Sequence, residues 1–209
     1  LDPTNVSGWA NQGSGGDASE LTAGQNPAYT ASGPDGTAQV DFADTDSHAM
    51  VFTDVIPGNL TCWVLMNHTT FGAADPQNLF WSSSSWGIYT DGNLAGDNLA
   101  AYNGIWQNAV ASPGLGWHVS RWSLRDWTAG FEPGPSSFAV DDGAEDTNNI
   151  VWTQTSPSWT NLSRTGAGEN LHGEIKQIIM TDLFVDDADS RHQDVLDYFK
   201  DVYPTLVTY

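Results

Sequence analysis

The chain has 209 residues, with 6 Lys+Arg against 26 Asp+Glu and a formal net charge of −20 at pH 7. Such a surface repels phosphate backbones and anionic lipid headgroups, so the composition excludes nucleic-acid binding and disfavours a membrane surface. The length fits one domain, 1–209, that folds without disulfides. No apolar run approaches the roughly 20 residues that cross a bilayer.

Short runs rich in Val, Ile, Thr and aromatic residues alternate with turns rich in Gly, Asn, Asp and Ser, which is typical of an all-β sandwich. The opening, through Asp17, is expected to be irregular. Helical spacing occurs only in 190–203, where acidic residues are expected in the first turn and Pro204 marks the end. Strands are expected in nine segments: 38–42, 49–55, 60–66, 78–81, 87–89, 99–102, 116–125, 137–140 and 174–184.

The single cysteine, Cys62, cannot form a disulfide within the chain. It lies in the apolar run Leu60-Thr61-Cys62-Trp63-Val64-Leu65, which is expected to be a buried strand. A cysteine in such a run is expected to act as a small core residue rather than as a reactive thiol.

Several segments follow one another in a distinctive order along the chain. They are GWANQGSGG at 8–16, QVDFADTD at 39–46, the Trp-containing strand at 60–66, GWHVS at 116–120, FAVDDG at 138–143, GEIKQIIM at 173–180 and YFKDVY at 198–203. In this order they resemble the laminin G-like branch of the concanavalin A-like lectin/glucanase superfamily. The resemblance implies a jelly-roll sandwich of two antiparallel sheets with one short C-terminal helix. The chain departs from the family at Gln177, where relatives often carry an acidic residue.

Glucanases of this superfamily carry two carboxylates on one strand with the spacing E-x-D-x-x-E. The spacing matters because an acid and a base, or an acid and a nucleophile, must face one cleft at a fixed separation. None of the five glutamates stands in that pattern: Glu20, Glu132, Glu145, Glu169 and Glu174. Glu145 and Asp146 fall in 141–149, which is expected to be a loop. The five histidines also lack the spacing of a zinc site. Because neither a carboxylate pair nor a zinc site is indicated, the sequence predicts that the protein is not an enzyme.

Aromatic residues are the main binding signal, because the chain has 10 Trp. Trp9, Trp63, Trp117 and Trp122 lie in segments whose family counterparts fill the core. The mid-chain aromatics instead surround turns rich in Gly and Asn, where flat rings could stack on sugars and amides could bond hydroxyl groups. Core packing and contact with a neighbouring protein remain open for them. The predicted glycan-binding residues are Trp81, Trp86, Tyr89, Tyr102, Trp106, Asn98 and Asn103, with Asn78 and Asp97 beside them.

Clustered carboxylates suggest calcium as a cofactor, since calcium prefers hard oxygen ligands on a turn. The predicted metal ligands are Asp141, Asp142, Glu145 and Asp146, and Asp44 and Asp46 form an earlier cluster. Neither cluster matches an EF-hand loop.

The leading interpretation is a non-catalytic, surface-exposed lectin-like module for glycan binding or adhesion. It would act outside a cell or on a virion, as a phage capsid decoration or tail component. Two alternatives stay open: a purely structural virion or cell-surface interaction protein, and a polysaccharide hydrolase or lyase. The expected partner is a glycan or a neighbouring surface protein, with no nucleic acid and no membrane insertion. A homo-oligomer is also left open.

Overall fold

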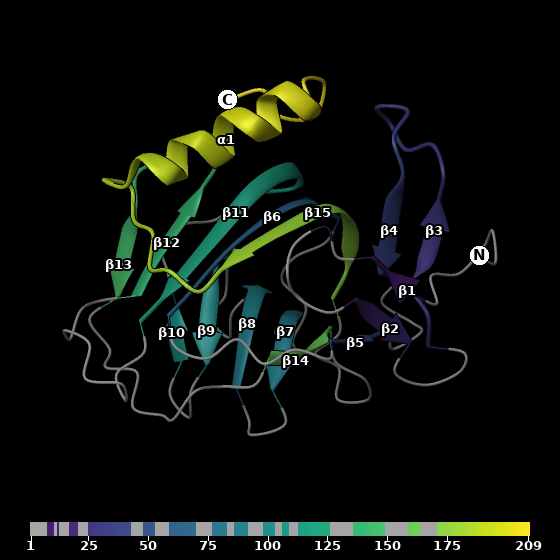
Figure 1. Ribbon diagram of the computed structural model, residues 1–209, viewed down its shortest axis with the longest axis horizontal. Helices are drawn as coiled ribbons and strands as arrows, with labels where there is room; N and C mark the ends of the chain where they lie inside the picture. Colours follow the sequence, from purple (N-terminus) through teal and green to yellow (C-terminus); the bar gives the residue numbers. More distant parts are fainter. Residues whose placement is uncertain are drawn as a thin grey trace.

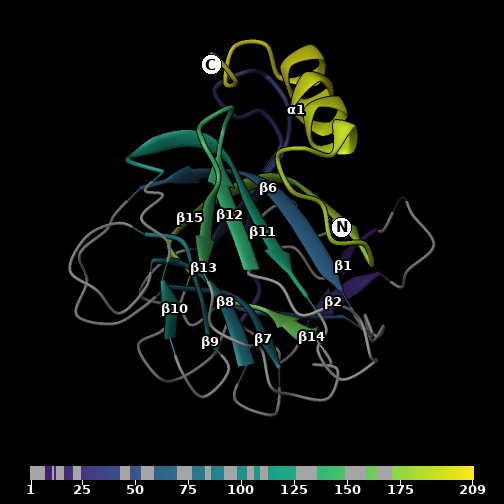
Figure 2. The ribbon, with the colours of Figure 1, turned by 90° about the vertical axis from the view of Figure 1, so that its left-hand side faces the viewer.

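The chain folds into two antiparallel sheets that face each other, with helix α1 (Ser190–Val202) on the outer side of one of them (Figure 1). A view turned by 90° shows the same order of layers, from helix to seven-stranded sheet to eight-stranded sheet (Figure 2). This computed structural model describes residues 8–10, 12, 17–20, 25–42, 48–52, 59–69, 77–82, 86–91, 98–102, 106–108, 113–125, 136–148, 159–163 and 171–209.

The seven-stranded sheet lies between the helix and the other sheet. Its central strand β6 pairs with β11 on one side and β15 on the other, and β6 is buried along almost its whole length. The strand order is β13 (Asp146–Asn148), β12 (Ser136–Val140), β11 (Gly116–Leu124), β6 (Leu60–His68), β15 (Gly173–Thr181), β4 (Gln39–Phe42) and β3 (Ala28–Thr30).

The eight-stranded sheet is built mainly from the N-terminal and middle parts of the chain, with β14 inserted between β5 and β7. The strand order is β1 (Gly8–Trp9), β2 (Ala18–Glu20), β5 (Met50–Phe52), β14 (Trp159–Leu162), β7 (Gln77–Ser82), β8 (Trp86–Asp91), β9 (Ala100–Tyr102) and β10 (Trp106–Asn108).

The main core fills the space between the two sheets. Because alternate strand residues point to opposite faces, each sheet sends every second side chain inward, including Phe80, Ile88, Cys62 and Trp122. The indole Nε1 of Trp122 donates to the carbonyl of Tyr89 at 3.2 Å, which links β11 to β8 across the sandwich. Cys62 is fully buried and burial raises the pKa of its thiol, so it is the core residue that the sequence predicted.

A second core lies between the seven-stranded sheet and α1. Trp63 and Leu65 of β6 and Val119 of β11 point away from the main core and pack against Leu196 and Phe199 of the helix. This arrangement explains why β6 is apolar at nearly every position: one face meets the other sheet and the opposite face meets the helix. No helix in the described ranges is long and apolar enough to cross a membrane.

The fold class that the sequence predicted, a concanavalin A-like jelly-roll sandwich with one C-terminal helix, is confirmed. All nine expected strands overlap observed ones, and Trp63 and Trp122 are buried while Trp9 and Trp117 pack partly buried against the cores. Six short strands were not expected: β1, β2, β3, β10, β13 and β14.

The opening, expected to have little regular structure, contains the two-residue strand Gly8–Trp9, which pairs with β2. Two local expectations were wrong. The segment 141–149 is not a continuous loop, because Asp146–Asn148 pairs with β12. The first turn of α1 holds no acidic residue, since Asp189 is instead the N-cap, with its carboxylate accepting from the backbone N–H of Arg191 at 3.0 Å.

Candidate functional site

The register of the eight-stranded sheet separates its inner face from its outer face. Met50, Leu162, Phe80, Ile88 and Ala101 are successive cross-strand partners from β5 to β9. All five are fully buried members of the main core. This row therefore marks the inner face, and the neighbouring residue on each strand points outward.

The outward row crosses the same strands one residue away. Val51 pairs with Asn161, Asn161 with Trp81, Trp81 with Gly87, and Gly87 with Tyr102. Residues directly opposite in an antiparallel pair share a face, so these side chains lie on the outer face of the sheet. Figure 1 shows this sheet on the side of the molecule away from the helix. Apart from Gly87, which is buried, all of them are partly exposed. The backbone of Trp106 continues the row, because it pairs with Tyr102.

Glycine at position 87 leaves room for two neighbouring side chains in the middle of this outward row. A β-carbon there would lie 2.5 Å from Cε2 of Tyr89 and 2.8 Å from the amide nitrogen of Asn78, both shorter than a carbon contact allows. The Tyr89 ring and the Asn78 amide therefore pack against the glycine, between the positions of Trp81 and Tyr102. Within the described part of the chain, neither amide atom of Asn78 has a hydrogen-bond partner, although the side chain is fully buried.

The structure brings some of the predicted glycan-binding residues together and separates others. Trp81 and Tyr102 are half-buried on the same outward row. Tyr89 and Asn98 are 1% and 6% exposed, so in this structure their side chains offer almost no surface to a ligand. The side chains of Trp86 and Trp106, and Asp97 and Asn103 entirely, lie outside the described residues.

The predicted calcium ligands lie on the β12–β13 hairpin, where Asp141 and Glu145 accept hydrogen bonds from other residues. Asp141 accepts from Nδ1 of His118 at 2.7 Å and from the backbone N–H of Val119 at 2.8 Å. The hydrogen bond with Asp141 raises the pKa of His118, although burial opposes the shift. Asp142 is exposed and Asp146 is half-buried on β13. Calcium binding here stays a prediction, and Asp44 and Asp46 lie outside the described residues.

Glu145, the remaining predicted ligand, holds the helix segment to the sheet. Its Oε2 accepts from Nη2 of the buried Arg121 at 3.0 Å and from the backbone N–H of Asp187 at 2.8 Å. Asp187 returns the contact, since its Oδ2 accepts from the backbone N–H of Glu145 at 2.8 Å and its Oδ1 lies 2.8 Å from Nη1 of Arg121. This arrangement ties residue 145 to residue 187, just before α1 begins.

A carboxylate pair that the sequence analysis missed lies on the outer face of the seven-stranded sheet. Asp41 of β4 is directly opposite Glu174 of β15, and Glu174 accepts from the amide of Asn67 at 2.7 Å. Burial, followed by the negative charge of Glu174, raises the pKa of Asp41. The two residues are far apart in the sequence, so no linear pattern of the E-x-D-x-x-E type could have shown them.

The histidines show no metal centre within the described ranges, where no three His, Cys, Asp or Glu side chains are grouped to hold an ion. His68 is buried, which is the main cause that lowers its pKa to about 3. His192 accepts a hydrogen bond at Nδ1 from the indole of Trp63 at 3.1 Å.

No protein-family model and no curated protein matches the sequence. Solved structures do match in fold. The binding domain of botulinum neurotoxin DC in complex with SialylT aligns with a TM-score of 0.56 at 12% identity, over 98% of this chain and 52% of that one. The receptor-binding domain of the mosaic serotype C/D toxin aligns with a TM-score of 0.56 at 9% identity, over 94% and 51%. That of type G aligns with a TM-score of 0.53 at 7% identity, over 93% and 51%.

The described chain thus shares its two-sheet, concanavalin A-like fold with these domains. The chain spans about half the length of each of these matched chains. The ligand named for the DC domain therefore belongs to that longer protein and is not assigned to the matched half.

Proposed function

We propose that this protein is a non-catalytic glycan-binding module whose ligand lies along the outer face of β7, β8 and β9. The observation that carries the proposal is the outward row, in which Trp81 and Tyr102 are separated by Gly87. Two strand spacings separate these two aromatic residues by about 10 Å, which is the length of two linked sugar rings. Large aromatic side chains that stay partly exposed on one face of a sheet are typical of a contact surface.

Within this proposal, the buried residues support the exposed ones. Tyr89 and Asn78 pack into the space that Gly87 leaves, between the positions of the two rings. Trp106 extends the row by one strand, since its backbone pairs with Tyr102. The glycan would lie across the strands, and the partner would be found outside the cell. None of the matched structures named above is described as part of a virus particle, so we place the site on an exterior surface only.

Binding can be tested on a glycan microarray with the full chain, followed by calorimetry on the glycans that bind. Trp81→Ala and Tyr102→Ala should each weaken binding by at least about fivefold, because truncating a central contact residue costs more than about 1 kcal/mol. Tyr29→Ala is the matched control, since Tyr29 is an exposed aromatic on β3 of the other sheet.

The thermal unfolding of each variant shows whether the fold is intact. Binding that is unchanged in both folded variants would contradict this location of the site. Absence of any glycan binding by the wild-type chain would contradict the function and favour contact with a neighbouring protein.

Polysaccharide hydrolysis is a second candidate, and one observation favours it: the pair Asp41–Glu174 joins a carboxyl of raised pKa to a neighbouring carboxylate. Release of reducing ends from a bound polysaccharide, lost in Asp41→Asn and Glu174→Gln, would establish it. The proposal of a non-catalytic module expects no release with the wild-type chain.

A further inference from the structure

The chain has few cations, and the structure accounts for most of them. Of its 6 Lys and Arg residues, five lie in the described part of the chain. Two of these are buried in ion pairs on the seven-stranded sheet. Arg121 is 1% exposed and contacts Glu145 and Asp187, while the side chain of Lys176 is fully buried 2.6 Å from Asp35.

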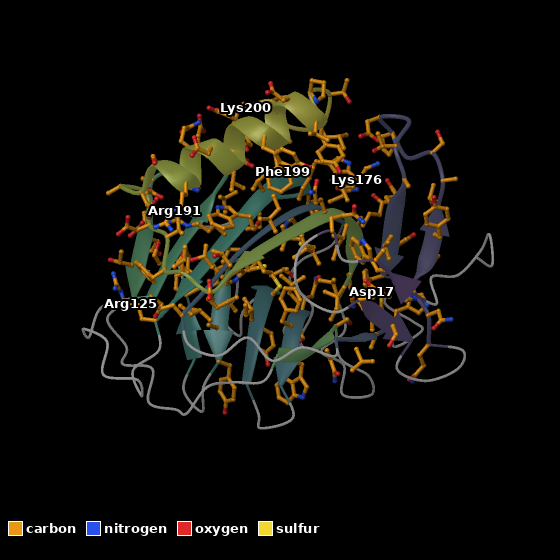
Figure 3. All side chains as sticks on the ribbon, in the orientation of Figure 1. Asp17, Arg125, Lys176, Arg191, Phe199 and Lys200 are labelled. Atoms are coloured by element: carbon orange, nitrogen blue, oxygen red, sulfur yellow. The ribbon has the colours of Figure 1, made fainter. Side chains whose placement is uncertain are left out.

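The other three described cations also lie away from the outward row. Arg191 and Lys200 are on α1, and Arg125 follows β11, with its guanidinium 3.6 Å from the ring centre of Phe184. Figure 3 shows Arg191, Lys200 and Lys176 on the helix side of the molecule and Arg125 lower down at its left-hand edge, while the eight-stranded sheet lies on the side opposite the helix. At physiological salt the Debye length is about 8 Å, so Arg191 and Lys200, which reach solvent on the helix side, are largely screened from a ligand on the opposite side. Arg121 and Lys176 are instead neutralised by the carboxylates that they contact.

Acidic sugars, whether sialic acids, uronic acids or sulfated residues, are usually held by Arg or Lys, which bind carboxylate and sulfate directly. None of the five described cations faces the outward row, and the protein as a whole carries a formal charge of −20. We infer that the site on the outer face of β7–β9 takes neutral glycans and discriminates against acidic ones. This inference rests on the proposed function and specifies its ligand class.

Two variants test the inference by changing the positive charge near the proposed site. Asn161 stands directly opposite Trp81 on the outward row and is half-buried, so Asn161→Lys adds a cation beside the site. Arg164 is the one cation outside the described residues, and it follows β14 closely in the chain, so Arg164→Gln removes the remaining candidate. Asn161 is on β14, outside the face of β7–β9 that is proposed to contact the glycan.

The experiment measures binding of the full chain to matched pairs of glycans, such as lactose against sialyllactose and galactan against polygalacturonan. Each pair is measured at low and physiological salt, with calcium and with a chelator. The acidic member of each pair should bind about five- to tenfold more weakly than the neutral one at low salt. This difference in affinity should become smaller as salt screens the repulsion between the acidic glycan and the protein. Asn161→Lys should narrow the gap at low salt, and Arg164→Gln should leave neutral binding unchanged.

The outcomes separate the two proposals. Absence of binding to every glycan would overturn the proposed function and this inference with it. If the acidic glycans bind as well as or better than the neutral ones, this inference alone is overturned. The same holds if the binding of acidic glycans requires calcium or is lost in Arg164→Gln. If the wild-type chain prefers neutral glycans and Asn161→Lys reduces that preference, the proposed function and this inference are both supported.

Discussion

We predict that the contacts of Arg121 with Glu145 and Asp187 contribute strongly to stability, because they join the sandwich to the segment that leads into α1. Replacement of Arg121 by methionine tests this prediction. The guanidinium is 1% exposed and lies on the outer face of β11. It donates to Ser137 Oγ at 2.6 Å and to Glu145 at 3.0 Å, and it lies 2.8 Å from Asp187. Arg121→Met keeps most of the side-chain volume but removes the charge, so two carboxylates lose their shared partner.

The expected magnitude follows from the burial of the three groups. Removing one partner of a fully buried ion pair costs about 3–5 kcal/mol. Here the side chains of Glu145 and Asp187 are 19% and 36% exposed, so water can partly solvate them in the variant. We therefore expect a loss of about 2 kcal/mol, which lowers the melting temperature of a chain this long by about 4–8 °C.

The variant should also change the titration of His192. Burial, followed by the positive charge of Arg121, lowers the pKa of His192 to about 4. Arg121→Met removes the second cause, so the pKa of His192 should rise, which an NMR titration of the imidazole measures. Unfolding would also raise this pKa because it removes the burial of His192, so the titration is recorded at a temperature at which the variant is folded.

Arg191→Met is the matched control, because Arg191 is exposed at the start of α1 and pairs only locally with its N-cap Asp189. It should leave both the melting temperature and the pKa of His192 unchanged. The reasoning is refuted if Arg121→Met and Arg191→Met melt at the same temperature, or if the pKa of His192 does not move.

Three further predictions concern other parts of the molecule. Gly87→Ala should destabilise the protein by about 1–3 kcal/mol, because its β-carbon collides with the Tyr89 ring; denaturant unfolding measures this, and Gly8→Ala, whose nearest contact is at 3.7 Å, should change little. Asp41→Asn should raise the melting temperature at pH 7 by about 1–3 °C, since it removes like-charge repulsion with a neighbour across the strands. Because the pKa of Asp41 is raised in the folded state, the carboxyl favours folding below its unfolded pKa of 3.8 and that contribution is lost as pH rises. The gain should therefore vanish in melting curves recorded below about pH 4, and a gain that is constant with pH would contradict it. If calcium binds the β12–β13 hairpin, millimolar calcium should raise the melting temperature of the wild type but not of Asp142→Asn; identical curves with calcium and with a chelator would end that prediction.

The sequence alone determined the fold class, because the signals that carry it are local. Short runs rich in β-branched and aromatic residues between turn residues, such as the apolar run in Leu60–His68, indicate strands, and the helical spacing that begins at Ser190 indicates the one helix. The short strands escaped prediction for the opposite reason. Gly8–Trp9 and Trp106–Asn108 are too short to show any period, and they are strands only because a partner strand supplies their hydrogen bonds.

Residue type likewise suggested that mid-chain aromatics matter, while only the tertiary structure decided which of them share a surface. Trp81 and Tyr102 face the same way because β7, β8 and β9 pair in one register, and a shift of one residue would turn each ring into the core. Tyr89 follows the same parity, yet it is buried against Gly87.

Charge pairing was decided in the same way. Glu145 looked like a free calcium ligand in the sequence, but folding brings Arg121 and Asp187 to it. Asp41 and Glu174 became neighbours only when β4 paired with β15. Strand pairing joins residues that are distant in the chain, so the composition of a site can be read from a sequence, while its geometry is set by which strands lie side by side.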